Sequence, residues 1–162
     1  METALGQQRR RDSLPSSGLE IHLGYWLRQV SNHVSGAYAR ALHTRETSVA
    51  EWVVLSHVQA RNGVSPSDLA EALGLTRGAI SKVLDKLERK GWISRATHAR
   101  DNRVQMVSLT RPGRRILPRL AEIADRNDAQ FFDCLDDGER DDLRRLLRKL
   151  AEFHHIRDVP VE

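Results

Sequence analysis

The sequence predicts a mainly α-helical protein with one small β-hairpin. Apolar residues recur every three or four positions through most of the chain, residues typical of helix ends punctuate this pattern, and one short segment alternates apolar and polar residues instead. The 162 residues suffice for a small lobe with helical extensions. No apolar run approaches the roughly 20 residues that a membrane-spanning helix needs.

The N-terminal part of the chain divides into an arm and a helix. Residues 1–17 are polar and contain three consecutive arginines, which predicts a disordered basic arm. From about Leu19 to His43 apolar residues follow a helical period over a broad stripe. A stripe this wide needs a partner surface, either the rest of the chain or a second subunit.

Three helices are expected next, each with its own start signal. Ser48 and Glu51 have the spacing of a capping box, and this helix ends near Gly63. A short helix begins after Ser65 and ends at Gly74. Thr76 caps a longer helix that runs to Lys90. Two helices joined by a tight turn, the second polar and basic on its outer side, are typical of a helix-turn-helix.

A β-hairpin is expected after the third of these helices. Residues 92–97 and 104–109 form the two strands, because the second segment alternates apolar and polar residues. The polar, basic connection over residues 98–103 forms the tip. A hairpin in this place is the wing of a winged helix-turn-helix.

Two further helices complete the predicted fold. Thr110 caps a helix that continues to about Cys134, and the last helix starts at residues 136–139. The expected organisation is a basic arm at 1–17, a dimerisation helix at 18–47, a winged helix-turn-helix lobe at 48–110, dimerisation helices at 111–155 and a tail at 156–162. We expect the apolar faces of the first and last helices to be buried against a second chain that is related by a two-fold axis.

The positive charge is concentrated in one stretch. Residues 76–115 contain eleven Lys and Arg side chains against three Asp and Glu, whereas the whole chain carries a net charge of only +4. A local basic surface is the electrostatic pattern expected of a protein that binds a polyanion, although it also fits a solvated charged face.

Three motifs in sequence resemble the MarR family of bacterial regulators. They are the run from Leu73 to Ile93, the Asp101-Asn102-Arg103 triplet in the wing, and the Leu109-Thr110-Arg111-Pro112-Gly113 entry into the next helix. The order of elements is similar to that family over about residues 19–155. The resemblance implies a triangular homodimer that binds pseudo-palindromic operators in double-stranded DNA.

The resemblance also implies which residues contact DNA. On the helix after Thr76 they are Thr76, Arg77, Gly78, Ser81 and Lys82, and in the wing they are Arg100, Asn102 and Arg103. Arg and Lys can donate to guanine in the major groove, and a wing arginine is attracted to a narrow minor groove. Gly78 departs from relatives that carry a hydrogen-bonding side chain there. Lys86, Arg89 and Lys90 either contact phosphates or are simply solvated.

Effector binding is a further implication of the resemblance. In similar proteins a small aromatic or anionic molecule binds between the helical region and the DNA-binding lobe and releases a repressor from its operator. The candidate lining residues here are His22, Tyr25, Trp26, Trp52 and His57. The alternative is that the tryptophans are ordinary core residues, and for either one taken singly this is the favoured interpretation.

Other sensors and activities find little support in the sequence. Cys134 has no basic neighbour in sequence, which predicts a buried, inert thiol. No residue spacing typical of a metal site or a catalytic centre is present, so no metal, cofactor or enzymatic activity is expected. We expect a cytoplasmic, nucleoid-associated bacterial protein. The alternatives are a winged-helix module that binds proteins and a constitutive DNA-binding protein without a ligand response.

Overall fold

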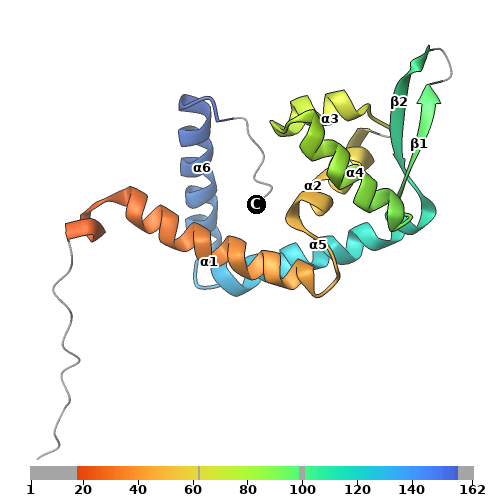
Figure 1. Ribbon diagram of the computed structural model, residues 1–162. Coiled ribbons are helices and arrows are strands. Elements are labelled where there is room, and N and C mark those ends of the chain that lie inside the picture. The colour runs from red at the N-terminus through yellow and green to blue at the C-terminus, as the bar shows by residue number, and fades with distance from the viewer. Residues whose placement is uncertain (1–17, 62, 99–100, 157–162) are drawn as a thin grey trace, which may run out of the picture. The chain divides into compact units, whose positions relative to one another are not determined.

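The computed structural model describes residues 18–61, 63–98 and 101–156, with the side chains of 98 and 101–104 excepted. The described residues fall into two compact units, one that ends at His33 and one that begins at Val34. The boundary falls inside one continuous helix, α1 (Leu23–His43). Figure 1 labels the elements along the chain.

The described part of the first unit contains a 3-10 turn, η1 (Gly18–Ile21), and the N-terminal half of α1. The prediction of one helix from Leu19 is therefore wrong at its start, because a separate turn precedes α1. The Trp26 indole Nε1 donates to the Glu20 carbonyl oxygen at 2.8 Å and so ties the turn to the helix. The large apolar side chains of this unit are exposed, and they are Leu19, Ile21, Leu23, Trp26, Leu27 and Val30.

The second unit contains the helix-turn-helix. After the C-terminal part of α1, its next helices are α2 (Val49–Arg61), α3 (Pro66–Leu73) and α4 (Arg77–Arg89). The predicted caps are confirmed, since the Ser65 and Thr76 hydroxyls accept from the backbone N–H groups of Asp68 and Ala79. Gly74 ends α3 in the left-handed conformation at φ 63°, which lets the chain turn sharply into α4.

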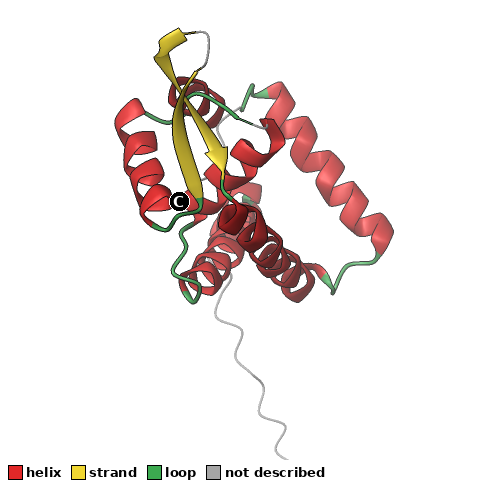
Figure 2. Cartoon of the chain, turned by 90° about the vertical axis from the view of Figure 1, so that its right-hand side faces the viewer, coloured by secondary structure: helices red, strands yellow, loops and turns green. Residues whose placement is uncertain are grey.

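The hairpin pairs β1 (Ile93–His98) with β2 (Asp101–Leu109), as the antiparallel ribbon in Figure 2 shows. The strands extend beyond the prediction, and His98 pairs with Asp101 after an irregularity at Thr97. The expected six-residue tip is therefore wrong, because a bulge allows backbone pairing to continue. Val64 adds a bridge to the outer edge through two backbone hydrogen bonds with Val107.

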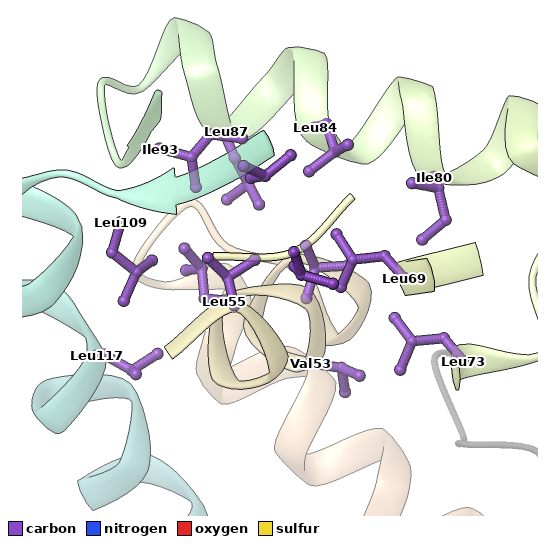
Figure 3. Close-up of a cluster of buried hydrophobic side chains, with 14 of the residues drawn as sticks. Val53, Leu55, Leu69, Leu73, Ile80, Leu84, Leu87, Ile93, Leu109 and Leu117 are labelled. Carbon is purple, nitrogen blue, oxygen red and sulfur yellow. The ribbon is translucent and has the colours of Figure 1, made fainter. Parts of the chain in front are cut away.

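The core lies where α2, α3, α4, the hairpin and α5 (Arg111–Phe132) meet. Figure 3 shows side chains from these elements pointing toward one another. The fully buried members include Leu55, Leu69, Leu73, Ile80, Leu84, Leu87 and Val107. Removing such side chains from water is the main force that holds the recognition elements together.

Two long helices complete the second unit. α5 begins at the Thr110 cap, whose hydroxyl accepts from Gly113 N and donates to the Gly91 carbonyl oxygen. α6 (Asp137–Phe153) begins with a capping box between Asp136 and Glu139. No residue of α6 is buried, and its exposed apolar side chains are Leu143, Leu146, Leu147, Leu150 and Phe153.

Candidate nucleic-acid interface

The α4 helix separates its side chains cleanly into a buried and an open side. Ile80, Leu84 and Leu87 are fully buried. The predicted DNA-contacting residues of this helix are all exposed, and they are Thr76, Arg77, Gly78, Ser81 and Lys82. The apolar side of α4 is thus packed against the core. The polar side of its N-terminal turns stays open to a binding partner.

The Thr76 hydroxyl has a structural task at the start of α4. It accepts a hydrogen bond from Ala79 N at 3.2 Å, which satisfies one of the free N–H groups of the first turn. The oxygen is therefore held in place, although its own proton can still be donated. Gly78 lies on the same exposed surface, and no atom lies within 4 Å of the position where a Cβ would be added.

The two acidic side chains of α4 pair with a strand arginine. Arg95 of β1 contacts Asp85 Oδ1 through NH2 at 2.5 Å and Glu88 Oε2 through Nε at 3.4 Å. The Arg95 side chain is only 18% exposed, so it is held between the hairpin and the helix. Sequence reasoning missed this contact, which offsets the negative charge beside the polar side of α4 and ties the wing to it.

Lys90 lies at the C-terminal end of α4. The expectation that its side chain is simply solvated is wrong. Its ammonium lies 2.8 Å from Glu51 Oε1 and 2.5 Å from the Glu46 carbonyl oxygen, and it also lies over the Trp92 ring at 4.8 Å. The Glu51 side chain is 4% exposed and its other oxygen accepts from Ser48 N at 2.7 Å. Lys90 therefore neutralises a buried carboxylate and joins α4 to the start of α2.

The wing is formed by β1 and β2. Asn102 and Arg103 belong to β2, not to a loop, and their side chains lie outside the described residues, as does Arg100. At the base of the hairpin Trp92 packs against the core. The wing therefore begins from a fixed base next to α4, since Trp92 N donates to the Leu87 carbonyl oxygen at 3.0 Å.

The five candidate effector residues are divided between the two units. His22, Tyr25 and Trp26 belong to the first unit, where Tyr25 and Trp26 form an edge-to-face pair at 5.5 Å. Trp52 and His57 lie on α2 in the second unit. The His57 Nδ1 lies 3.1 Å from the Val53 carbonyl oxygen, and Trp52 packs against the core. Their combination into one site remains a prediction.

Tyr38 is a residue that sequence reasoning treated only as part of an apolar stripe. Its ring meets Trp52 edge to face at 5.5 Å, and its buried hydroxyl has no hydrogen-bond partner among the described residues. Burial raises the pKa of the Tyr38 phenol above its usual range, and the charge of Asp128 raises it further. Nearly all buried polar side-chain atoms in proteins have a hydrogen-bond partner, so the Tyr38 hydroxyl is an exception among the described residues.

Cys134 is exposed, so the prediction of a buried thiol is wrong, because it follows the end of α5 where the chain turns toward α6. The described residues contain no group of three or more side chains that could hold a metal ion. The described helices include no segment with the length and apolarity that crossing a bilayer demands.

Comparison with known proteins gives a consistent result. The MarR family profile matches residues 47–104. A putative transcriptional regulatory protein for the hcr operon of Thauera aromatica is 36% identical over 129 residues, which cover 79% of this chain and 78% of that protein. The residues that the family profile matches contain α2, α3, α4, β1 and the start of β2.

Solved structures share the fold. A mutant MarR from E. coli complexed with operator DNA matches with a TM-score of 0.71 and 25% identity, over 84% of this chain and 99% of that one. CouR from Rhodococcus jostii, bound to p-coumaroyl-CoA, matches with a TM-score of 0.71 and 26% identity, over 84% of this chain and 96% of that one. The chain belongs to the MarR family and is a DNA-binding transcriptional regulator.

Proposed function

We propose that this regulator binds a pseudo-palindromic operator as a homodimer and acts as a cytoplasmic, non-enzymatic repressor that a small molecule releases. The observation that carries the DNA-binding half is the exposure of the polar side of α4, whose apolar side is fully buried. A helix fixed in this way can enter the major groove without rearranging the core. The similar MarR structure complexed with operator DNA supports this mode of binding.

The roles of individual residues follow from their chemistry. Arg77 and Lys82 donate to guanine O6 and N7, and Ser81 reaches a base or a phosphate. Thr76 and Gly78 bring the backbone of the first turn close to DNA. Arg100, Asn102 and Arg103 of the wing approach the adjacent minor groove. Base contacts in the major groove then determine sequence preference, whereas phosphate contacts raise affinity for any sequence.

The dimer is proposed from exposed apolar surface in each unit. The described part of the first unit exposes six large apolar side chains, with Trp26 at 46%, and α6 exposes four leucines. Large exposed apolar patches mark surfaces that bind another protein. We assign the segments 18–47 and 111–155 to dimerisation and 48–110 to DNA binding. Replacement of Leu146 and Leu147 by Glu should convert a dimer into a monomer in analytical ultracentrifugation.

The effector is proposed to be a phenolic or acidic small molecule. The similar CouR structure with p-coumaroyl-CoA supports this class of ligand. In this chain the unpaired Tyr38 hydroxyl beside Trp52 supports a polar, aromatic contact near α2, with His57 on the same helix and with His22, Tyr25 and Trp26 as candidates from the first unit. Operator affinity that no phenol or aromatic acid alters would contradict this half of the proposal.

Selection of genomic fragments bound by the purified protein tests the DNA-binding half. A palindromic consensus with half-sites about one helical turn apart is expected of a two-fold dimer with two recognition helices. On that operator, replacing Arg77 or Lys82 by Ala should lower both affinity and sequence preference, whereas Arg103→Ala should weaken binding to all sequences alike. Unchanged operator affinity in all three variants would contradict the proposed docking.

A further inference from the structure

Gly78 is a glycine that neither the backbone nor the packing of the protein requires. It lies in the first turn of α4. Positive φ angles, which favour glycine, occur in the second unit at Gly63, Gly74 and Gly91, so Gly78 does not need glycine for its conformation. Gly113 needs its small size, because a Cβ there would lie 1.9 Å from the Trp92 carbonyl oxygen. At Gly78 an added Cβ would meet no atom within 4 Å.

Glycine is also unfavourable for the helix that contains Gly78. It destabilises a helix relative to alanine, because glycine loses more backbone freedom on folding. Gly78 lies on the polar side of α4, where its exposed neighbours are Arg77, Ser81 and Lys82. A glycine that serves neither conformation nor internal packing is typical of a place where another molecule approaches the backbone closely.

The surroundings of Gly78 form a small notch on the polar side of α4. We name as the Gly78 notch the exposed backbone of this residue together with the side chains of Arg77, Ser81 and Lys82. Ser81 and Lys82 follow Gly78 by three and four positions and are its neighbours on the helix surface. Side chains of a helix lean toward its N-terminus, so these two flank the notch. They leave it open, because neither comes within 4 Å of a Cβ at residue 78.

The chemistry of the major groove indicates which base edge fits the Gly78 notch. Residue 78 has no side chain that could pair with a base, and its backbone N–H points along the helix axis, not outward. A hydrogen-bonding group pressed against the notch would lose water without gaining a partner, which is unfavourable. The C5 methyl of thymine is the apolar group that bases present in the major groove, and it has no hydrogen bond to lose. Thymine therefore fits the notch best.

We infer that Gly78 determines part of the sequence preference of this regulator, because the Gly78 notch holds the C5 methyl of one thymine in each half-site. The inference rests on the proposed docking of α4 in the major groove and adds the class of base that one position reads. The methyl group lies against the Gly78 Cα and the aliphatic stem of Lys82. An alanine at residue 78 would place its own methyl group there, so that the protein methyl and the DNA methyl exclude each other.

Uracil substitution in the operator selected by the wild type tests this inference. Uracil lacks only the C5 methyl of thymine, so each thymine of one half-site is replaced in turn and affinity is measured by fluorescence anisotropy. At one position uracil should weaken wild-type binding about fourfold, which corresponds to the burial of about one methyl group. At this position Gly78→Ala should bind the uracil duplex at least as tightly as the thymine duplex, because the added methyl replaces the missing one.

Gly24→Ala is the matched control variant. Gly24 is an exposed glycine of α1 at which an added Cβ also meets no atom within 4 Å. This variant should keep the wild-type ratio between the affinities for the thymine and uracil duplexes. Thermal melting should show Gly78→Ala to be at least as stable as the wild type, since alanine favours the helix, so that a changed preference does not reflect a loss of fold.

A third duplex tests the methyl group apart from the thymine base. With 5-methylcytosine at the sensitive position the wild type should bind more tightly than with cytosine, because the methyl group is restored. In Gly78→Ala this difference should disappear. Equal binding of the two cytosine duplexes by the wild type would overturn the inference.

The outcomes separate the Gly78 notch from the proposed function. Uracil penalties that are the same in the wild type and Gly78→Ala would overturn the inference, and this includes a variant that weakens all duplexes alike, which indicates a phosphate contact. If Arg77→Ala and Lys82→Ala still weaken operator binding in that case, the proposed docking remains intact. A wild type that binds no palindromic operator contradicts the proposed function, and the inference fails with it.

Discussion

The Lys90 ammonium lies 2.8 Å from the Glu51 carboxylate, which is almost fully buried, so that the end of α4 is joined to the start of α2. A buried carboxylate that loses its cationic partner keeps the cost of leaving water without the compensating attraction. The Lys90 side chain is 26% exposed, so solvent lessens this cost but does not remove it.

We therefore expect Lys90→Met to lower the free energy of unfolding by about 2 kcal/mol. Chemical denaturation monitored by circular dichroism measures this quantity. The control is Lys149→Met at an exposed position on α6, which should stay near the wild type. Equal stability of the two variants would show that the Lys90–Glu51 pair contributes nothing.

Arg95 should affect DNA binding although it lies on β1. Its removal by Arg95→Ala frees Asp85 and Glu88 beside the polar side of α4, where their charges repel phosphates. Operator affinity should fall about tenfold at physiological salt, as measured by fluorescence anisotropy. The triple variant Arg95→Ala/Asp85→Asn/Glu88→Gln removes the freed charges and should recover most of the affinity. A triple variant as weak as the single one would assign the loss to displacement of the wing instead.

Gly113 should tolerate no side chain. A Cβ added there would lie 1.9 Å from the Trp92 carbonyl oxygen, which already accepts from Thr110 N, so the start of α5 and the base of the hairpin would have to separate. We expect Gly113→Ala to destabilise the protein by about 3 kcal/mol or more. Gly78→Ala is the matched control, because that position is open and Ala favours the helix by up to about 1 kcal/mol. Similar melting temperatures for both variants would refute the close approach.

Tyr38→Phe should stabilise the protein, because it removes a buried hydroxyl that has no partner among the described residues. The gain should be about 1 kcal/mol at neutral pH. The raised pKa also predicts a pH dependence, since the unfolded chain ionises this phenol above pH about 10 while the folded chain does not. The free energy of unfolding is therefore unaffected by this group below that pH and falls as the pH rises further. In Tyr38→Phe the free energy of unfolding should fall less over the same pH range. Denaturation at neutral and alkaline pH measures both effects.

The local elements could be predicted because their signals act over a few residues. Ser48, Ser65, Thr76 and Thr110 each accept a backbone N–H three positions along, so the helix starts depend only on residues that are neighbours in the chain. The same holds for the end of α3 at Gly74. The exposed side of α4 follows from helical periodicity, which places Ile80, Leu84 and Leu87 on one face.

Contacts between elements could not be predicted in this way. Lys90 and Glu51 are 39 positions apart, and nothing in the sequence distinguishes Arg95, which pairs with Asp85, from an arginine that stays in solvent. The hairpin extended beyond its predicted ends because backbone pairing, not side-chain alternation, sets where strands stop. Thus the sequence alone determined the helices, their caps and the polar side of α4, since these follow from local chain geometry. Only the tertiary structure decided which charges pair and which hydroxyl is left unpaired, since these depend on how distant segments pack.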